Sequence, residues 1–199
     1  MGQRSQIYVR YNNKLIIANY YQWNYGERMI SRARYGIEHL QNYVDNGYDF
    51  VFSDKSYITK MSRIFDTNFD MKDIVVSSNI ISDYIKDKKD GYINDVNFNQ
   101  FAFYYQDNND GKLFIDIQDN KIKYAFTDWN CKTILDPEQY MVWDMDKDWK
   151  NDLKEHEEKN AIKICEENMK EISKMANLMT MEELEDFINH DYQIDFNEY

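Results

Sequence analysis

The sequence lacks the residues that several common kinds of functional site require. Its six glycines are scattered along 199 residues and never cluster, which excludes a Walker-type phosphate loop and a dinucleotide-binding fingerprint. The two cysteines, Cys131 and Cys165, have no short pairing motif, as expected for free thiols in a reducing compartment. The three histidines form neither an HExxH motif nor a paired metal spacing. We therefore expect no catalytic residue, metal site or cofactor.

Long apolar runs are also missing. Runs such as Leu15-Ile16-Ile17 are far shorter than the roughly 20 residues of a membrane-spanning helix, and the N-terminus has no apolar signal region. We therefore expect a cytoplasmic protein with no membrane partner. The single proline and the many Asn, Lys, Ile, Asp and Tyr residues show the codon bias of an AT-rich genome. This bias indicates a low-GC bacterium, or a phage or mobile element living in one.

Charge is divided unequally along the chain. Residues 1–40 contain six basic and two acidic residues and have a net charge of +4. Since the whole chain has a net charge of −12, residues 41–199 have a net charge of −16. An acidic body repels nucleic acid and attracts proteins that are basic because they hold nucleic acid. The charge pattern therefore predicts a basic nucleic-acid-binding protein as the partner, with no direct contact to DNA or RNA.

The first half of the sequence alternates between strand and helix patterns. A hairpin is predicted around the turn Asn12-Asn13, because Asn tolerates the positive φ of a two-residue turn. Its strands cover 6–11 and 14–21, and helices are expected over 26–44, 55–65 and 72–88 from apolar residues three or four apart. A three-stranded meander then follows over 98–105, 112–118 and 121–127, with turn residues in both connections.

The sequence after residue 135 is predicted to be helical. Asp136 followed by Pro137 indicates a helix start, with a short helix over 138–143. The stretch 151–160 is polar on all sides and is expected to project into water, whereas an apolar stripe runs over 161–179. Thr180 is predicted to cap a last helix, with Glu183 completing a capping box.

This order of elements predicts an α+β fold with an antiparallel sheet, made of the hairpin and the meander, packed with helices. We expect a core domain over 1–143 and an acidic helical appendage over 144–199 that packs on it. Over roughly the first 130 residues the order loosely resembles that of N-terminal nucleophile hydrolases. These enzymes use an N-terminal Thr, Ser or Cys, whereas this chain begins Met1-Gly2-Gln3-Arg4 and has no such residue before Ser5.

One acidic segment matches part of a calcium-binding pattern. The acids at positions 1, 3, 5, 9 and 12 of an EF-hand loop are Asp144, Asp146, Asp148, Asp152 and Glu155. Position 6, where the turn needs Gly, is Trp149, so we favour an acidic helix start over a calcium loop. A calcium-binding regulator stays open as an alternative function.

Arginines and aromatic residues lie together near the N-terminus. Trp23 precedes Arg28 and Arg32, which are one helical turn apart. This composition is typical of interface hot spots, although core and surface packing would also account for it. We include these three residues in a predicted partner-binding surface, and a homodimer is a further possibility.

The function that the sequence favours is that of a non-enzymatic acidic binding protein. We expect an anti-CRISPR-like inhibitor, encoded by a phage or mobile element, that binds a host defence protein and mimics nucleic acid through carboxylates spaced along a helix. Its acidic face is predicted to comprise Asp144, Asp146, Asp148, Asp152, Glu155, Glu157 and Glu158. The alternatives are a hydrolase of unrecognised family on the α+β core and the calcium-binding regulator.

Overall fold

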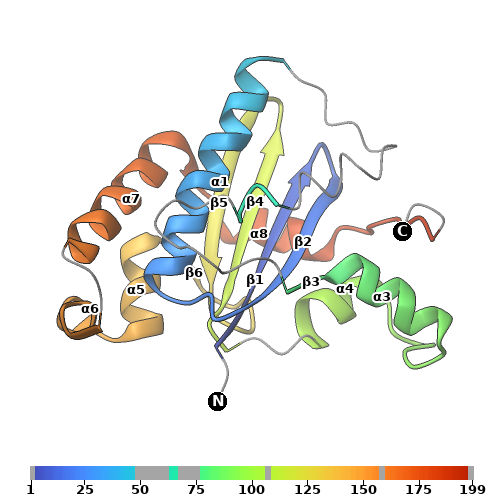
Figure 1. The fold of residues 1–199 in the computed structure, drawn as a ribbon. Helices are drawn as coiled ribbons and strands as arrows, with labels where there is room; N and C mark the ends of the chain where they lie inside the picture. The colour runs from blue at the N-terminus through green and yellow to red at the C-terminus, as the bar shows by residue number, and fades with distance from the viewer. Residues whose placement is uncertain (1–2, 48–62, 67–76, 106–108, 157–159, 197–199) are drawn as a thin grey trace.

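A seven-stranded sheet forms the centre of the protein (Figure 1). The computed structural model describes residues 3–47, 63–66, 77–105, 109–156 and 160–196. The strands are β1 (Arg4–Tyr11), β2 (Lys14–Gln22), β3 (Ser78–Asn79), β4 (Lys112–Gln118), β5 (Lys121–Thr127), β6 (Ile134–Leu135) and β7 (Asn177–Leu178). Their order is β3-β2-β1-β4-β5-β6, with β7 also paired to β5. The sheet is mostly antiparallel, and the α+β prediction is confirmed.

Two tight turns organise this sheet. Asn12 and Asn13 join β1 to β2 with positive φ angles of 44° and 65°, and Asp119 and Asn120 join β4 to β5 with 50° and 60°. Asn and Asp tolerate this left-handed conformation, which matches the twist of a hairpin. Both predicted turns are confirmed. The two hairpins meet where β1 pairs in parallel with β4.

Helices cover both faces of the sheet (Figure 1). They are α1 (Glu27–Asp45), α3 (Ile80–Lys89), α4 (Phe98–Gln100), the π-helix η1 (Phe101–Tyr105), α5 (Pro137–Met145), α6 (Trp149–His156), α7 (Ala161–Met175) and α8 (Met181–Asn189). Buried residues of α1, α5, α6 and α7 form one core with the sheet. Buried residues of α3, α4, η1 and α8 form a second core on the other face.

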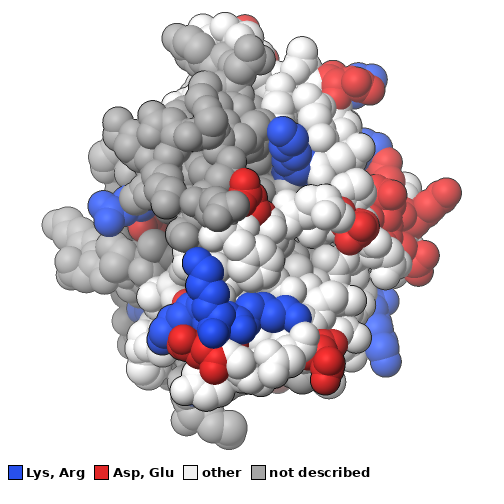
Figure 2. All heavy atoms as spheres, turned by 90° about the vertical axis from the view of Figure 1, so that its right-hand side faces the viewer, with Lys and Arg blue, Asp and Glu red and all other residues white. Residues whose placement is uncertain are grey.

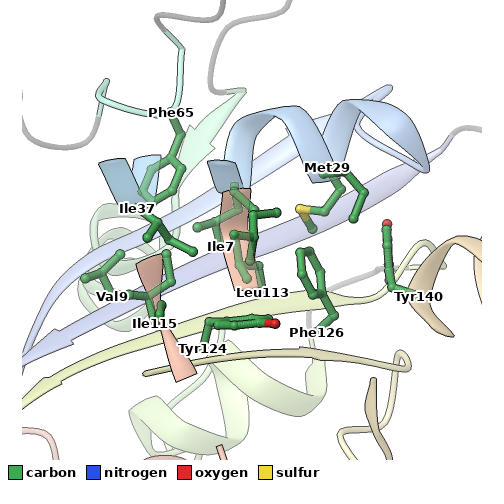
Figure 3. Packing of buried hydrophobic residues seen from close by; sticks show 14 of the residues in the cluster. Ile7, Val9, Met29, Ile37, Phe65, Leu113, Ile115, Tyr124, Phe126 and Tyr140 are labelled. Atoms are coloured by element: carbon green, nitrogen blue, oxygen red, sulfur yellow. The ribbon is translucent and has the colours of Figure 1, made fainter. Parts of the chain in front are cut away.

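The first core is built around α1 (Figure 3). Its predicted apolar stripe is confirmed, since Ile30, Ala33, Ile37 and Leu40 are buried. Gly36 allows the ring of Phe65 to approach, because a Cβ atom there would lie 2.0 Å from Phe65 Cε1. This close contact holds the turn at residues 63–66 against the helix.

The second core is aromatic. Tyr8 stacks on Phe114 with ring centroids 5.3 Å apart, and Phe187 of α8 meets Phe114 edge-on at 5.2 Å. Phe103 of η1 packs against the same two strands. Because α8 contributes Leu184, Phe187 and Ile188 to this core, its position on the sheet is fixed by burial.

The strand predicted over 98–105 is wrong, because this segment is helical. Asn97 caps it: its side chain accepts a hydrogen bond from Gln100 N at 2.9 Å, while Gln100 Oε1 accepts one from Asn97 N at 3.2 Å. This capping box begins a helix despite the strand-like aromatic composition. The meander is formed instead by β4, β5 and β6.

The helix predicted over 72–88 begins later than expected. Ser78 and Asn79 pair with β2 as a short strand, and Asn79 then caps α3 by accepting a 3.0 Å hydrogen bond from Ser82 N. Residues 72–76 of this predicted helix lie outside the described residues. The same applies to 55–62 of the helix predicted over 55–65, and residues 63–66 form a turn.

Helix starts in the C-terminal part agree with prediction. Asp136 and Thr180 each form a capping box at the start of α5 and α8. The expectation that 151–160 projects into water is wrong for α6, because Leu153 and the preceding Trp149 are buried in the first core. Each core combines residues from before and after residue 143. The division into two domains at this point stays a prediction.

Candidate functional site

The acidic residues predicted as a single partner-binding face are not all on one surface. Asp144 is half-buried and accepts a 2.6 Å hydrogen bond from Gly26 N, whereas Asp146, Asp148 and Asp152 are exposed. The side chain of Glu155 and all of Glu157 and Glu158 lie outside the described part. Helix α6 also carries Lys150 and Lys154, and these lysines offset its two acids.

This segment also does not fold as an EF-hand loop. Residues 149–156 form α6, and Trp149, at the position where the loop would need a glycine turn, is 1% exposed. Within the described residues, no three His, Cys, Asp or Glu side chains are grouped in a way that could hold a metal ion.

The predicted basic residues have different surroundings. Trp23 is 53% exposed, and its carbonyl accepts a 3.0 Å hydrogen bond from Arg28 Nη1. Arg32 is instead buried beneath α1, where Nε donates to Asn24 Oδ1 at 2.9 Å and Nη1 donates to the Phe65 carbonyl at 2.5 Å. Its position on the buried stripe of α1 directs it inward. Arg32 therefore connects elements in the interior and is not part of the surface.

A charged cleft lies at the carboxyl ends of the two parallel strands, β1 and β4. The turns that follow these strands lead away in opposite directions, to β2 and β5. The cleft has a volume of about 750 Å³ and is lined by Arg10, Asn13, Asp116, Gln118, Asp119, Lys121, Lys123, Thr180, Glu182, Glu183 and Asp186.

A buried ion pair forms the floor of the cleft. Arg10 of β1 lies opposite Asp116 of β4, with hydrogen bonds from Nε at 2.8 Å and from Nη2 at 2.7 Å. The pairing of β1 with β2 shifts at Arg10, as at a bulge that redirects a side chain. Burial lowers the pKa of Arg10, but its contacts with Asp116 outweigh this effect and raise the pKa above its usual value.

Helix α8 is attached to the sheet by charge contacts along the cleft. Asp186 Oδ2 accepts a 2.8 Å hydrogen bond from Arg10 Nη1, and Glu183 pairs with Lys123 of β5. The pKa of Glu183 is lowered, first by its hydrogen bond from Lys123 and then by the one from Thr180 N. Two of the four acids of α8 therefore fix the helix in place.

The remaining acids of α8 face solvent. Glu182 and Glu185 are exposed, and α8 contains no basic residue. Leu178 and Met181, just before and at the start of the helix, are each 40% exposed. We call Leu178, Met181, Glu182 and Glu185 the α8 face. It combines carboxylates with apolar contact area, the composition of a surface that binds a basic protein.

The basic residues of α3 do not form a comparable surface. The last turn of α3 carries Lys86, Lys88 and Lys89, and basic side chains gather on the face shown in Figure 2. Acidic side chains lie beside them in the same view, and α3 itself includes Asp83 and Asp87 with Asp90 as its C-cap. The local charge of this region is therefore close to zero, which does not favour a polyanion.

Two carboxyls at the opposite end of the sheet are close enough to influence each other. Burial raises the pKa of Asp144 to about 7, and the charge of Asp110 adds to this effect. Burial also raises the pKa of Asp110 to about 6, opposed by its hydrogen bond from Arg4 N. The Tyr140 hydroxyl donates to the Asp110 carbonyl at 2.9 Å. This group holds the first residues of α1 and β1 against α5.

Sequence reasoning missed the cleft because its residues are far apart in the chain. Arg10, Asp116 and Asp186 have no spacing that connects them. The parallel pairing of β1 with β4 brings Arg10 beside Asp116, and the packing of α8 on the sheet brings Asp186 to Arg10. The signal for the α8 face was present, since 181–189 holds four acids without a base.

No known family model matches the chain, and no curated protein or solved structure shows significant similarity to it. In the described residues, no helix combines the length and apolar character that crossing a membrane requires.

Proposed function

We propose that the protein is a non-enzymatic binding protein whose α8 face and adjoining cleft bind a basic, nucleic-acid-handling protein. The observation that carries this proposal is that two acids of α8 bind the sheet while the other two face solvent. Asp186 and Glu183 fasten the helix to Arg10 and Lys123, while Glu182 and Glu185 point to solvent beside exposed apolar residues. A rigid helix with outward carboxylates can replace backbone phosphates in a groove that normally holds nucleic acid.

The charges of the cleft favour the same class of partner. Arg10, Lys121 and Lys123 face five carboxylates among the residues that line the cleft, so the cleft is net acidic. A cationic side chain of the partner would improve this balance, whereas a phosphate group would worsen it. The biological role we propose is that of an anti-CRISPR-like inhibitor, encoded by a phage or mobile element, that competes with nucleic acid for a defence protein.

A hydrolase is supported less well by the geometry. The only hydroxyl among the described residues that line the cleft is that of Thr180, and it accepts a 3.2 Å hydrogen bond from Glu183 N as a helix cap. Both carboxylates nearest the floor, Asp116 and Asp186, are bound to Arg10. This arrangement positions charges for binding and offers no activated nucleophile.

The test is competition with DNA on purified, guide-loaded CRISPR nucleases. Fluorescence anisotropy of labelled target DNA would report its displacement as the protein is added, at low and at moderate salt. We expect displacement that weakens as salt rises, because exposed charges steer the encounter. If no nuclease in the panel releases DNA, the inhibitor role is wrong.

Two variants with the same change in charge locate the binding surface. E182Q/E185Q alters the α8 face, whereas E167Q/E171Q removes two carboxylates from α7, where Glu167 pairs with Lys163 and Glu171 with Lys174. We expect E182Q/E185Q to weaken competition about tenfold, a change of ~1.4 kcal/mol, and E167Q/E171Q to leave it unchanged. Equal effects of the two variants would attribute binding to overall charge and contradict a role for α8.

A further inference from the structure

A cavity of about 370 Å³ lies between the C-terminal segment and the helices α3 and α4. Residues 189–196 follow α8 and run past these two helices (Figure 1). They supply one wall of the cavity, while Tyr84 of α3 and residues 97–99 at the start of α4 supply the other. The volume is within the range of small-molecule sites in proteins. The cavity shares no lining residue with the charged cleft at the start of α8.

The C-terminal wall of this cavity is held in place by direct contacts with the helices. Asn99 Nδ2 donates to the carbonyls of Ile188 and His190, both at 2.7 Å. The rings of Phe196 and Tyr84 have their centroids 6.2 Å apart. These contacts form the cavity before any ligand enters it, which lowers the cost of binding.

The charges around the cavity disfavour an anionic ligand. Among the described residues that line it, there is one carboxylate, Asp191, and no Lys, Arg or His. Lys88 and Lys89 of α3 lie nearby, where Lys88 Nζ donates to the Asn94 carbonyl at 2.6 Å and Lys89 Nζ to the Phe196 carbonyl at 3.4 Å. A phosphate group in the cavity would meet Asp191 in a chain with a net charge of −12. We therefore expect a neutral ligand.

Four aromatic side chains line the cavity. Phe98 meets Tyr84 edge-on with ring centroids 5.4 Å apart, and it meets Tyr192 edge-on at 6.3 Å. These three rings are buried, whereas Phe196 is 41% exposed. Phe196 therefore offers ring surface on which a flat ligand can stack.

Amide side chains of the lining offer both donors and acceptors. Asn97 Oδ1 accepts from Gln100 N at 2.9 Å, and within the described residues its Nδ2 group has no acceptor. Asn99 has the opposite arrangement, because both Nδ2 hydrogens are used and Oδ1 is left to accept. Gln193 Nε2 donates to Asp191 Oδ2 at 2.8 Å, which likewise leaves Oε1. Adenine presents an amino donor beside ring-nitrogen acceptors, and Asn and Gln side chains bind this pair in protein–DNA complexes.

We propose that this cavity binds a neutral adenine nucleoside, with the base stacked on Phe196. The amino group of the base donates to Asn99 Oδ1, and a ring nitrogen accepts from Asn97 Nδ2. A nucleoside suits the lining better than a nucleotide because it has no phosphate. The proposal is independent of the α8 face, so it holds whether or not the protein inhibits a nuclease.

The experiment is equilibrium dialysis of the purified full chain with labelled adenosine. We expect a Kd on the order of 100 μM, as a ligand of this size allows. AMP should bind about tenfold more weakly, because its phosphate meets Asp191 without a cation in the lining. The proposal would be overturned if adenosine did not bind at about 1 mM, if AMP bound as tightly as adenosine, or if glucose displaced adenosine as well as unlabelled adenosine does.

Matched variants locate the ligand in the cavity. N97D keeps the oxygen that caps α4 and removes the donor group, whereas N94D makes the same change in charge at an exposed position outside the lining. We expect N97D to weaken adenosine binding about tenfold and N94D to leave it unchanged. F196A should also weaken it about tenfold through the lost stacking, unlike Y92A at a ring that is 78% exposed. Equal binding by the members of each pair would contradict the proposed site, and thermal melts verify that each variant is folded.

Discussion

The main-chain N–H of Gly26 donates a 2.6 Å hydrogen bond to Oδ2 of Asp144, and this contact connects the start of α1 to α5. The carboxylate accepts it despite a half-buried setting in which burial, and then Asp110, raise the pKa of Asp144 to about 7. The end of the sheet where the chain begins is therefore sensitive to pH in the range where ordinary carboxyls are already ionised.

We expect the protein to lose stability as pH rises from about 4 to about 7. Asp144 and Asp110 have folded-state pKa values of about 7 and about 6, above the value near 4 of an unfolded Asp. In this window the folded state binds more protons, so the free energy of unfolding falls until both groups are ionised.

D144N should flatten this dependence and raise stability at pH 8 by about 1 kcal/mol, allowing for partial exposure. D148N, an exposed position, is the control. Thermal melts from pH 4 to 8 measure the effect, and equal slopes in wild type and D144N would contradict it.

Breaking the Arg10–Asp116 pair should lower the free energy of unfolding strongly, whereas replacing both residues by apolar ones should lower it much less. The two side chains are only 3% and 9% exposed, and removal of Asp116 leaves the buried Arg10 with the exposed Asp186 as its carboxylate partner. D116L is expected to lose about 3–5 kcal/mol in urea unfolding, and R10M/D116L should recover most of it. R34Q breaks the partly exposed pair with Glu38 on the surface of α1 and should cost about 0.5 kcal/mol or less. A double variant as unstable as D116L would show that the pair itself stabilises the fold.

Gly36 should not tolerate alanine, although alanine is the better helix former. The added Cβ would meet Phe65 Cε1 at 2.0 Å, so we expect G36A to lose about 1–3 kcal/mol through overpacking. A smaller side chain opposite should relieve the clash, and G36A/F65L is therefore expected to be closer in stability to F65L than G36A is to wild type. Chemical unfolding of the four proteins gives the coupling energy. If the stability losses of G36A and F65L simply add in the double variant, the strain in G36A does not come from the contact with Phe65.

Local signals in the sequence predicted the fold correctly where no second signal pointed to a different structure. The Asn12-Asn13 turn, the stripe of α1 and the caps Asp136 and Thr180 all have the expected structure. The segment 98–105 was misread because its aromatic residues suit a strand, whereas the Asn97–Gln100 capping box starts a helix.

The site was harder to predict because it depends on tertiary pairing. The spacing of Arg32 from Arg28 is that of two arginines on one helix surface. In the structure, Arg32 instead donates hydrogen bonds to Asn24 and to the Phe65 carbonyl in the interior. Arg10 and Asp116 are brought together only by the parallel pairing of β1 with β4. Such long-range pairing leaves no local spacing pattern.

Hydrogen exchange of the protein bound to a guide-loaded nuclease that it inhibits tests the central proposal most directly. The account predicts that amides of α8, residues 181–189, and of the turn at Asp119 and Asn120 gain protection on binding, while those of α6 stay unchanged. Protection confined to α6 and α7, with α8 unaffected, would contradict it.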